Sequence, residues 1–132
     1  MKGICVDIED ETQDNQSFRK VVYTGNYMQL VYMRLQPGEE IGMEVHGNDQ
    51  FFRFEKGTGT VIVDETTHDV KDGSGVVVPA GAKHNVVNTS TSEDLHLYTI
   101  YAPPHHKDGV EYATKAEADA SDEEFDGKTS EQ

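Results

Sequence analysis

Cysteine, basic residues and long apolar runs are all scarce in this chain, and each shortage excludes a class of protein. The single cysteine, Cys5, has no partner for an internal disulfide. Only 11 Lys and Arg residues stand against 25 Asp and Glu, so the net charge of −14 repels nucleic acid backbones and anionic lipid headgroups. No stretch approaches the ~18 apolar residues of a membrane-spanning helix. We therefore expect neither a nucleic acid nor a membrane partner.

The N-terminus also lacks the features of a secretory signal. It reads MKGICVDIEDE and becomes acidic after a very short apolar run, which predicts a cytoplasmic protein. A length of 132 residues fits one domain with a single core, and a hydrophobic content of 35% is typical of a small barrel with polar ends. We expect three parts: an acidic arm or edge strand at 1–20, a β-barrel at 21–104, and an acidic segment at 105–132.

What the chain does contain is a succession of short β-like segments. Runs rich in β-branched and aromatic residues recur every ~8–12 residues, with turn residues between them, which is the pattern of an all-β sandwich or barrel. In the C-terminal segment, Thr114 followed by Glu117 predicts a capping box and a short helix, and the acids from Asp122 onward are expected to be disordered. The predicted strands are Tyr27–Leu35, Ile41–His46, Gln50–Lys56, Gly59–Val63, Thr67–Lys71, Gly75–Val78, His84–Asn88 and Leu95–Tyr101.

Two stretches share a fixed spacing of glycine, proline and polar residues. The first, Gly38 to Gly57, reads G-x5-E-x-H-x3-Q-x6-G. The second, Gly73 to Asn88, reads G-x5-P-x-G-x2-H-x3-N. Residues two apart on a strand share a face, so the polar residues of each motif are expected to point the same way, beside apolar neighbours. The polar residues with metal-binding atoms are Glu44, His46, Gln50 and His84.

These stretches resemble the two signature motifs of the cupin superfamily. The second motif matches at every fixed position, whereas the first carries Glu44, His46 and Gln50 where typical cupins carry His, His and Glu. The resemblance covers about half of the chain, from Pro37 to Pro104. It implies a double-stranded β-helix, the cupin jelly-roll barrel, followed by a short C-terminal helix or tail. It also implies a metal site, with the ligands Glu44, His46, Gln50 and His84.

The implied ligand set restricts the kind of metal. Two imidazoles, one carboxylate and one amide oxygen suit one divalent transition metal, Mn, Fe, Zn, Ni or Cu, better than Ca or Mg. The ligands alone do not identify which one. The alternative is a barrel that keeps cupin geometry without a metal, its polar residues hydrogen-bonded to each other and to trapped water.

Candidates for proton transfer lie near the end of the barrel. His96 alternates with Tyr98 on the last predicted strand, so the pair either faces the pocket or lies outside it. His105 and His106 follow a double proline and either fold back over the barrel mouth as acid/base groups or lie in a surface loop. We take His96, Tyr98 and His105 as the candidate catalytic residues.

A finer resemblance, to small single-domain cupins described as mannose-6-phosphate isomerase-like, rests on the stretches EVHGNDQFFR and LYTIYAPPHHKDG. It implies sugar isomerase-type chemistry on a small oxygenated molecule, with the metal polarising a carbonyl/hydroxyl pair. The few, unclustered basic residues favour a neutral sugar or sugar acid over a phosphosugar. The alternatives are a non-haem iron dioxygenase and a non-enzymatic ligand-binding cupin. We also expect a homodimer, because exposed strand edges and outward apolar side chains need cover.

Overall fold

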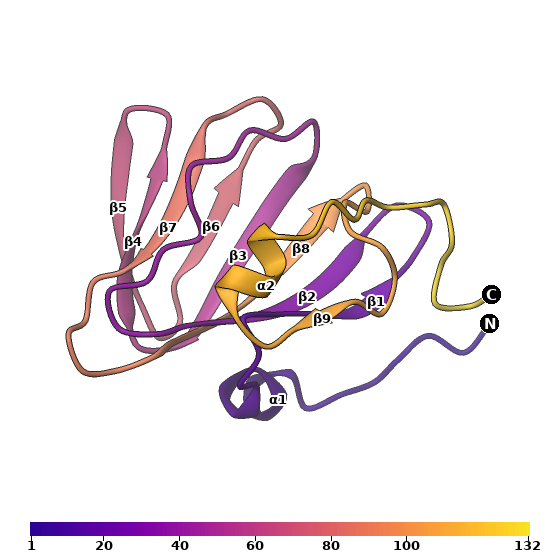
Figure 1. Ribbon diagram of the computed structural model, residues 1–132, viewed down its shortest axis with the longest axis horizontal. Helices are drawn as coiled ribbons and strands as arrows, with labels where there is room; N and C mark the ends of the chain where they lie inside the picture. The colour runs from indigo at the N-terminus through magenta and orange to yellow at the C-terminus, as the bar shows by residue number, and fades with distance from the viewer.

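Two antiparallel sheets face one another in the structure, a computed structural model that describes all 132 residues (Figure 1). The larger sheet has the strand order β6-β3-β8-β2-β1-β9, and the smaller has the order β5-β4-β7. The predicted all-β jelly-roll and its short C-terminal helix are confirmed. The elements are α1 (Ile8–Asp14), β1 (Arg19–Thr24), β2 (Gln29–Leu35), β3 (Asp49–Lys56), β4 (Thr58–Val63), β5 (Thr66–Lys71), β6 (Gly75–Val78), β7 (His84–Asn88), β8 (Leu95–Ala102), β9 (Glu111–Tyr112) and α2 (Lys115–Asp119).

The core lies between the sheets and is densest on β3 and β8. Phe52 and Phe54 of β3 are no more than 1% exposed, and Phe54 pairs across the ladder with the fully buried Leu97 of β8. Burying each of these side chains contributes about 1.5–3 kcal/mol to stability. Because side chains alternate along a strand, the same interior face carries Gln50 at one end of β3 and Tyr101 at the end of β8. The core therefore forms a rigid wall that positions polar groups at one end of the barrel.

The predicted strands agree with β2 to β8 apart from their ends, with one exception. The segment Ile41–His46 is not a strand, because it forms only isolated bridges, from Glu40 to Val87 and from Glu44 to His84. Gly42 interrupts the extended chain with a φ of 110°, a conformation that glycine adopts at little cost. Strands β1 and β9, at one edge of the larger sheet, were not predicted.

The acidic N-terminal arm contains a helix in place of the edge strand that the sequence allowed. Asp7 caps α1 by accepting a hydrogen bond from the backbone N–H of Asp10 (3.4 Å), and acids fill the first turn, where they favour the positive end of the helix dipole. The helix packs against the larger sheet through the buried Thr12 (Figure 1). Neither α1 nor α2 has the length and apolar character needed to cross a membrane.

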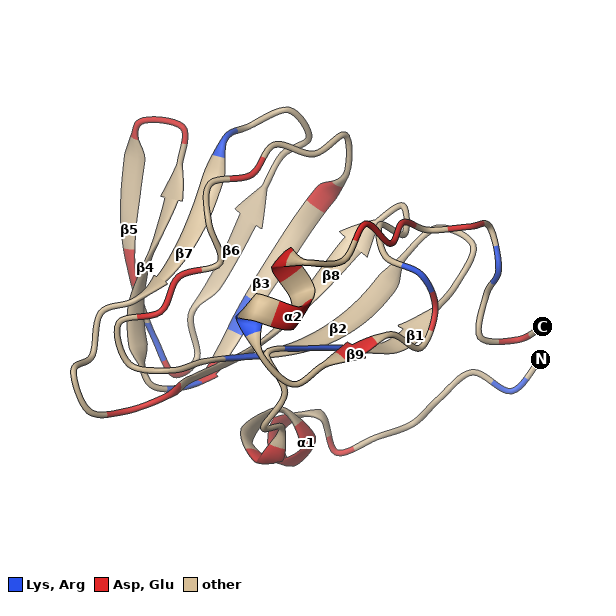
Figure 2. Ribbon diagram, viewed as in Figure 1, with Lys and Arg blue, Asp and Glu red and all other residues tan.

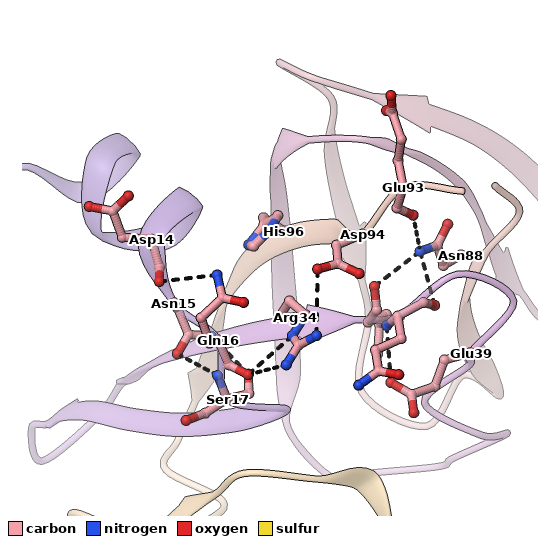
Figure 3. A network of polar contacts seen from close by, with 12 residues as sticks. Asp14, Asn15, Gln16, Ser17, Arg34, Glu39, Asn88, Glu93, Asp94 and His96 are labelled. Carbon is pink, nitrogen blue, oxygen red and sulfur yellow. Dashed lines mark hydrogen bonds and ion pairs between the residues drawn. The ribbon is translucent and has the colours of Figure 1, made fainter. Parts of the chain in front are cut away.

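Asn88, the last fixed residue of the second motif, connects two loops of the barrel (Figure 3). Its side-chain nitrogen donates to the backbone oxygens of Leu35 and Gln36, both at 3.0 Å, and of Glu93 at 2.9 Å. Asn88 is only 1% exposed, so these bonds satisfy its own amide nitrogen, which would otherwise be left without partners in the interior. The role of Asn88 in the motif is therefore structural.

Candidate metal centre

Backbone hydrogen bonds bring the two sequence motifs together. Glu44 and His46 lie in the loop between β2 and β3, beside His84 at the start of β7. The N–H of Glu44 donates to the carbonyl oxygen of His84 (2.8 Å), and the N–H of His84 donates back to that of Glu44 (2.9 Å). The N–H of Gly81, in the turn before β7, donates to the carbonyl oxygen of His46 (2.8 Å). The loop is thus held in place although it is not a strand.

Three potential metal-binding side chains converge at this point. Glu44, His46 and His84 each offer one donor atom, and these atoms all lie within 4.8 Å of one another. Oε2 of Glu44 is 2.6 Å from Nε2 of His46, and the two histidine ring centroids are 5.1 Å apart. His84 is buried, but 29% of the Glu44 side chain is exposed, so solvent reaches the group. Two imidazoles and one carboxylate are typical ligands of first-row transition metals.

The second ring nitrogen of His84 fixes which of its atoms is free to bind a metal. Nδ1 lies 3.1 Å from the carbonyl oxygen of Ala82. Because a carbonyl oxygen only accepts hydrogen bonds, Nδ1 must carry the proton and donate it. The lone pair of the neutral ring is then on Nε2, and the hydrogen bond at Nδ1 holds the ring in a fixed orientation.

Gln50, the predicted fourth ligand, has one oxygen without a partner. It is 4% exposed, and its Nε2 donates to the hydroxyl oxygen of Thr99 (3.0 Å). Its Oε1 is buried and accepts no hydrogen bond from the chain. A buried polar atom without a partner costs roughly 1–3 kcal/mol, and an amide oxygen is a known cation ligand. This unpaired oxygen fits the predicted role of Gln50, which stays a prediction.

The electrostatics of Glu44 also suit a metal ligand. Burial alone raises the pKa of Glu44, but the hydrogen bond from His46 and the electrostatic influence of His46, Arg19 and His84 outweigh burial and lower that pKa below its usual value. Glu44 is therefore ionised at neutral pH, as a ligand must be. The donor set and its charge together fit a divalent transition metal.

His105 is the one predicted catalytic residue that the structure places at this group. The chain folds back after β8, so that the His105 ring centroid lies 4.2 Å from that of His46 and 5.2 Å from that of Tyr101. Burial, together with the unfavourable electrostatic influence of His106 and His46 on a protonated ring, lowers the pKa of His105 to about 4. Its imidazole is consequently neutral at neutral pH.

His106 anchors the segment that follows β8 to the barrel. Its Nδ1 lies 2.9 Å from a carboxylate oxygen of Glu123, and its Nε2 lies 3.3 Å from the hydroxyl of Tyr101. The backbone N–H groups of His105 and His106 both donate to Oε1 of Gln29, at 3.1 and 2.9 Å. Both histidines thus fold back over the barrel mouth. The expected disorder after Asp122 is wrong for Glu123, because His106 holds its carboxylate.

His96 and Tyr98 lie on the face of β8 that points away from the metal centre. The interior face of this strand carries Leu95, Leu97 and Tyr101, which belong to the core. Nδ1 of His96 is 3.2 Å from the carbonyl oxygen of Thr12 in α1, and burial there lowers the pKa of His96. Figure 3 shows His96 beside this helix.

The sequence did not determine which face of β8 points to the pocket. In the structure, His96 and Tyr98 lie on the face that points away from it. Tyr101 is the tyrosine at the site, and it was missed. The signal that could have found it is the alternation of Leu95 and Leu97 with the polar residues of the same strand, since the leucines mark the buried face.

Two buried histidines and one half-buried histidine predict that acid destabilises the fold. Burial lowers the pKa of His96, His105 and His106 below the ordinary 6.5, in the case of His105 to about 4. Between these two pH values the unfolded chain binds more protons than the folded one. The free energy of unfolding therefore falls as the pH is lowered through this window. For the half-buried His105 alone we expect a loss of about 2 kcal/mol, after allowing for screening by solvent.

Urea unfolding in the presence of EDTA, at about pH 7 and about pH 4.5, measures this loss. The His105→Asn variant should lose less stability than the parent between the two conditions. His68→Asn, at an exposed position on β5, is the matched control and should behave as the parent does. An equal loss in all three proteins would contradict the role assigned to His105.

Comparison with known proteins agrees with this fold. The cupin domain model matches residues 31–101. The uncharacterized protein YrkC of Bacillus subtilis is 43% identical over 129 residues, which cover 92% of this chain and 69% of that protein. The crystal structure of BH2720 from Bacillus halodurans has a TM-score of 0.87 at 42% identity, over 89% of this chain and 94% of that chain.

A more distant structure shares the fold alone. An RmlC-like cupin from Shewanella frigidimarina has a TM-score of 0.60 at 20% identity, over 64% of this chain and 74% of that chain. The domain match covers more than half of the sequence, and it includes both motifs and all the side chains that converge at the candidate metal centre. The chain belongs to the cupin superfamily.

Proposed function

We propose that this cupin binds one divalent transition metal, Mn, Fe, Zn, Ni or Cu, and performs sugar isomerase-type chemistry on a small oxygenated molecule. Glu44, His46 and His84 would hold the metal, with Gln50 as a fourth donor. The observation that carries the proposal is the convergence of one carboxylate and two imidazoles within 4.8 Å. Four protein donors leave one or two coordination positions for a substrate oxygen.

The chain's own residues would move the proton. A bound divalent ion would supply polarisation of a substrate carbonyl and its neighbouring hydroxyl. His105 suits the role of proton acceptor, because its imidazole is neutral at neutral pH and its ring lies against His46. Burial raises the pKa of Tyr101, so its hydroxyl stays protonated. Because Nδ1 of His106 faces the carboxylate of Glu123, Nε2 of His106 accepts the Tyr101 proton, and the Tyr101 oxygen remains able to accept a hydrogen bond from a substrate hydroxyl.

A second candidate activity is that of a non-haem iron dioxygenase. Two histidines and one carboxylate, with open coordination positions, are the ligand set of that class. Glu44, His46 and His84 supply this set whether or not Gln50 binds. The two candidates differ in what they consume, because a dioxygenase takes up oxygen with its substrate and an isomerase does not.

Proton exchange and oxygen uptake separate these activities. The protein is loaded with each of the metals in turn and incubated in D₂O with a panel of aldoses, ketoses and sugar acids. Isomerase chemistry predicts that deuterium replaces the proton on the carbon beside the carbonyl, as followed by ¹H NMR, and that EDTA stops the exchange. Oxygen uptake by the iron-loaded protein without exchange would favour the dioxygenase. Neither result with any metal or substrate would contradict both proposals.

A further inference from the structure

Arg19 is buried inside the barrel although it carries a charge. It opens β1 with only 8% of its surface exposed, on the strand face that it shares with the buried Val21. The next residue, Lys20, lies on the other face and is exposed. The ladder partner of Arg19 is Met33 of β2, which belongs to the hydrophobic core. The strand therefore places a guanidinium among interior side chains.

No carboxylate or carbonyl of the chain pairs with this guanidinium. Its Nε is buried without a hydrogen-bond partner, and its central carbon lies 5.3 Å from the ring centroid of Phe18. The other two arginines are paired, Arg34 with the carbonyl oxygen of Gln16 (3.1 Å) and Arg53 with the carboxylate of Glu55 (2.7 Å).

Acidic residues are not scarce in this chain. There are 25 of them, and Figure 2 shows many on α1, on α2 and in the C-terminal segment. None forms an ion pair with Arg19, whereas Arg34 pairs with Asp94. Burying a guanidinium without an acceptor costs free energy, which an anion at hydrogen-bonding distance would offset. The acceptor is therefore expected to come from a bound molecule.

The charge of Arg19 acts on the residues of the metal centre. After burial and the neighbouring histidines, it is a further cause of the low pKa of His105. It also opposes the effect of burial on the pKa of Glu44 and of Tyr101. The sheet geometry is consistent with this influence. Arg19 lies opposite Met33 of β2, and Met33 lies opposite Leu97 of β8, whose buried strand face also carries Tyr101. The side chains of Arg19 and Tyr101 therefore enter the same interior.

We propose that Arg19 binds the carboxylate of a small hydroxy or keto acid, whose neighbouring oxygen is directed to the group formed by Glu44, His46 and His84. The inference rests on the proposed function and narrows its substrate class from small oxygenated molecules to small carboxylic acids, such as sugar acids. It explains why a buried arginine of this barrel has no partner for its Nε.

A carboxylate fits this position better than a phosphate. The planar guanidinium matches the two oxygens of a carboxylate with two parallel hydrogen bonds. A phosphate group would bring up to two negative charges to a protein of net charge −14, and the adjacent basic residue, Lys20, lies on the opposite face of the strand. The single positive charge of Arg19 is neutralised by the single negative charge of one carboxylate.

Binding of glycolate and of its neutral analogue glycolamide tests the proposal. The two probes share the hydroxyl group and differ in the carboxylate, so calorimetric titration of the metal-loaded protein should show a preference for glycolate. The Arg19→Met variant should bind glycolate roughly ten- to hundredfold more weakly and glycolamide unchanged. Lys20→Met removes the same charge from the other face of β1 and should keep the parent's preference. Arg19→Lys, which keeps the charge but loses the planar fork, should fall between the parent and Arg19→Met.

Several outcomes would overturn the proposal. They are equal binding of the two probes by the parent, no glycolate binding at its solubility limit, an equal loss in Lys20→Met, or tighter Arg19-dependent binding of inorganic phosphate. If Arg19→Met does not fold, Arg19→Lys and the parent's preference between probes still decide the matter. Metal content, measured on the same samples, separates the proposed metal site from the proposed carboxylate site. A parent protein that binds no metal contradicts the metal site. The preference of that metal-free protein for glycolate over glycolamide still tests the role of Arg19.

Discussion

Replacing His84 with alanine is expected to weaken the binding of a divalent transition metal by roughly a hundredfold or more. Loss of a residue that merely hydrogen-bonds to a metal ligand already costs about 10- to 100-fold in affinity, and His84 would be a ligand itself. It is one of two imidazoles in the group, and its Nδ1 is held by the carbonyl oxygen of Ala82 so that Nε2 is free. Competition titration with a chromogenic chelator at neutral pH measures the change.

The matched control for this prediction is His68→Ala. His68 lies exposed on β5, so its loss removes the same side chain without touching the site. Urea unfolding of both variants in the presence of EDTA shows whether either has lost its fold. A folded His84→Ala variant that binds metal as tightly as the parent would remove His84 from the ligand set.

Replacing His105 with asparagine is expected to slow substrate proton exchange by roughly 10²- to 10⁴-fold, the usual contribution of a positioned acid/base group. Asparagine keeps a polar side chain of similar size but cannot accept the proton. The backbone contact from His105 to Gln29 does not involve the ring, so the loop should stay in place. Exchange in D₂O, followed by ¹H NMR on metal-loaded protein, gives the rate.

Metal affinity should not change in the His105→Asn variant, because His105 is not one of the three side chains that converge at the candidate metal centre. A variant that loses metal and activity together would make His105 a ligand. If the variant exchanges protons at the parent's rate, a residue other than His105 must accept the proton. Neither result would contradict the proposal that Glu44, His46 and His84 bind a metal.

Much of the fold could be predicted because the motif spacing fixes turns as well as ligands. Gly57, which closes the first motif, has a φ of 95°, and a Cβ there would lie 2.5 Å from the backbone oxygen of Asp94. Only glycine suits such a position. Turns of this kind divide the chain into short strands, and the pairing of His84 with Glu44 then brings the two motifs together.

Other features depend on information that local sequence does not contain. The sequence does not determine which face of β8 points into the barrel. A shift of one residue in register exchanges the two faces, and both carry polar residues. The capped helix α1 was not predicted, because the acidic residues of this segment indicate an arm or edge strand and the cap depends on the position of a single residue, Asp7. Arg19 was counted among dispersed basic residues, since its burial depends on β1 pairing with β2 and β9. Tertiary contacts, and not residue types, determine all three.

The central claim is that Glu44, His46 and His84 hold a metal ion. A crystal structure of the metal-loaded protein, with anomalous diffraction recorded at the absorption edge of the metal, tests it most directly. We predict one strong anomalous peak within coordination distance of the three side chains, and of Oε1 of Gln50. A peak elsewhere, or none after loading with each candidate metal, would contradict the metal centre and leave a barrel whose polar groups bond only to each other and to water.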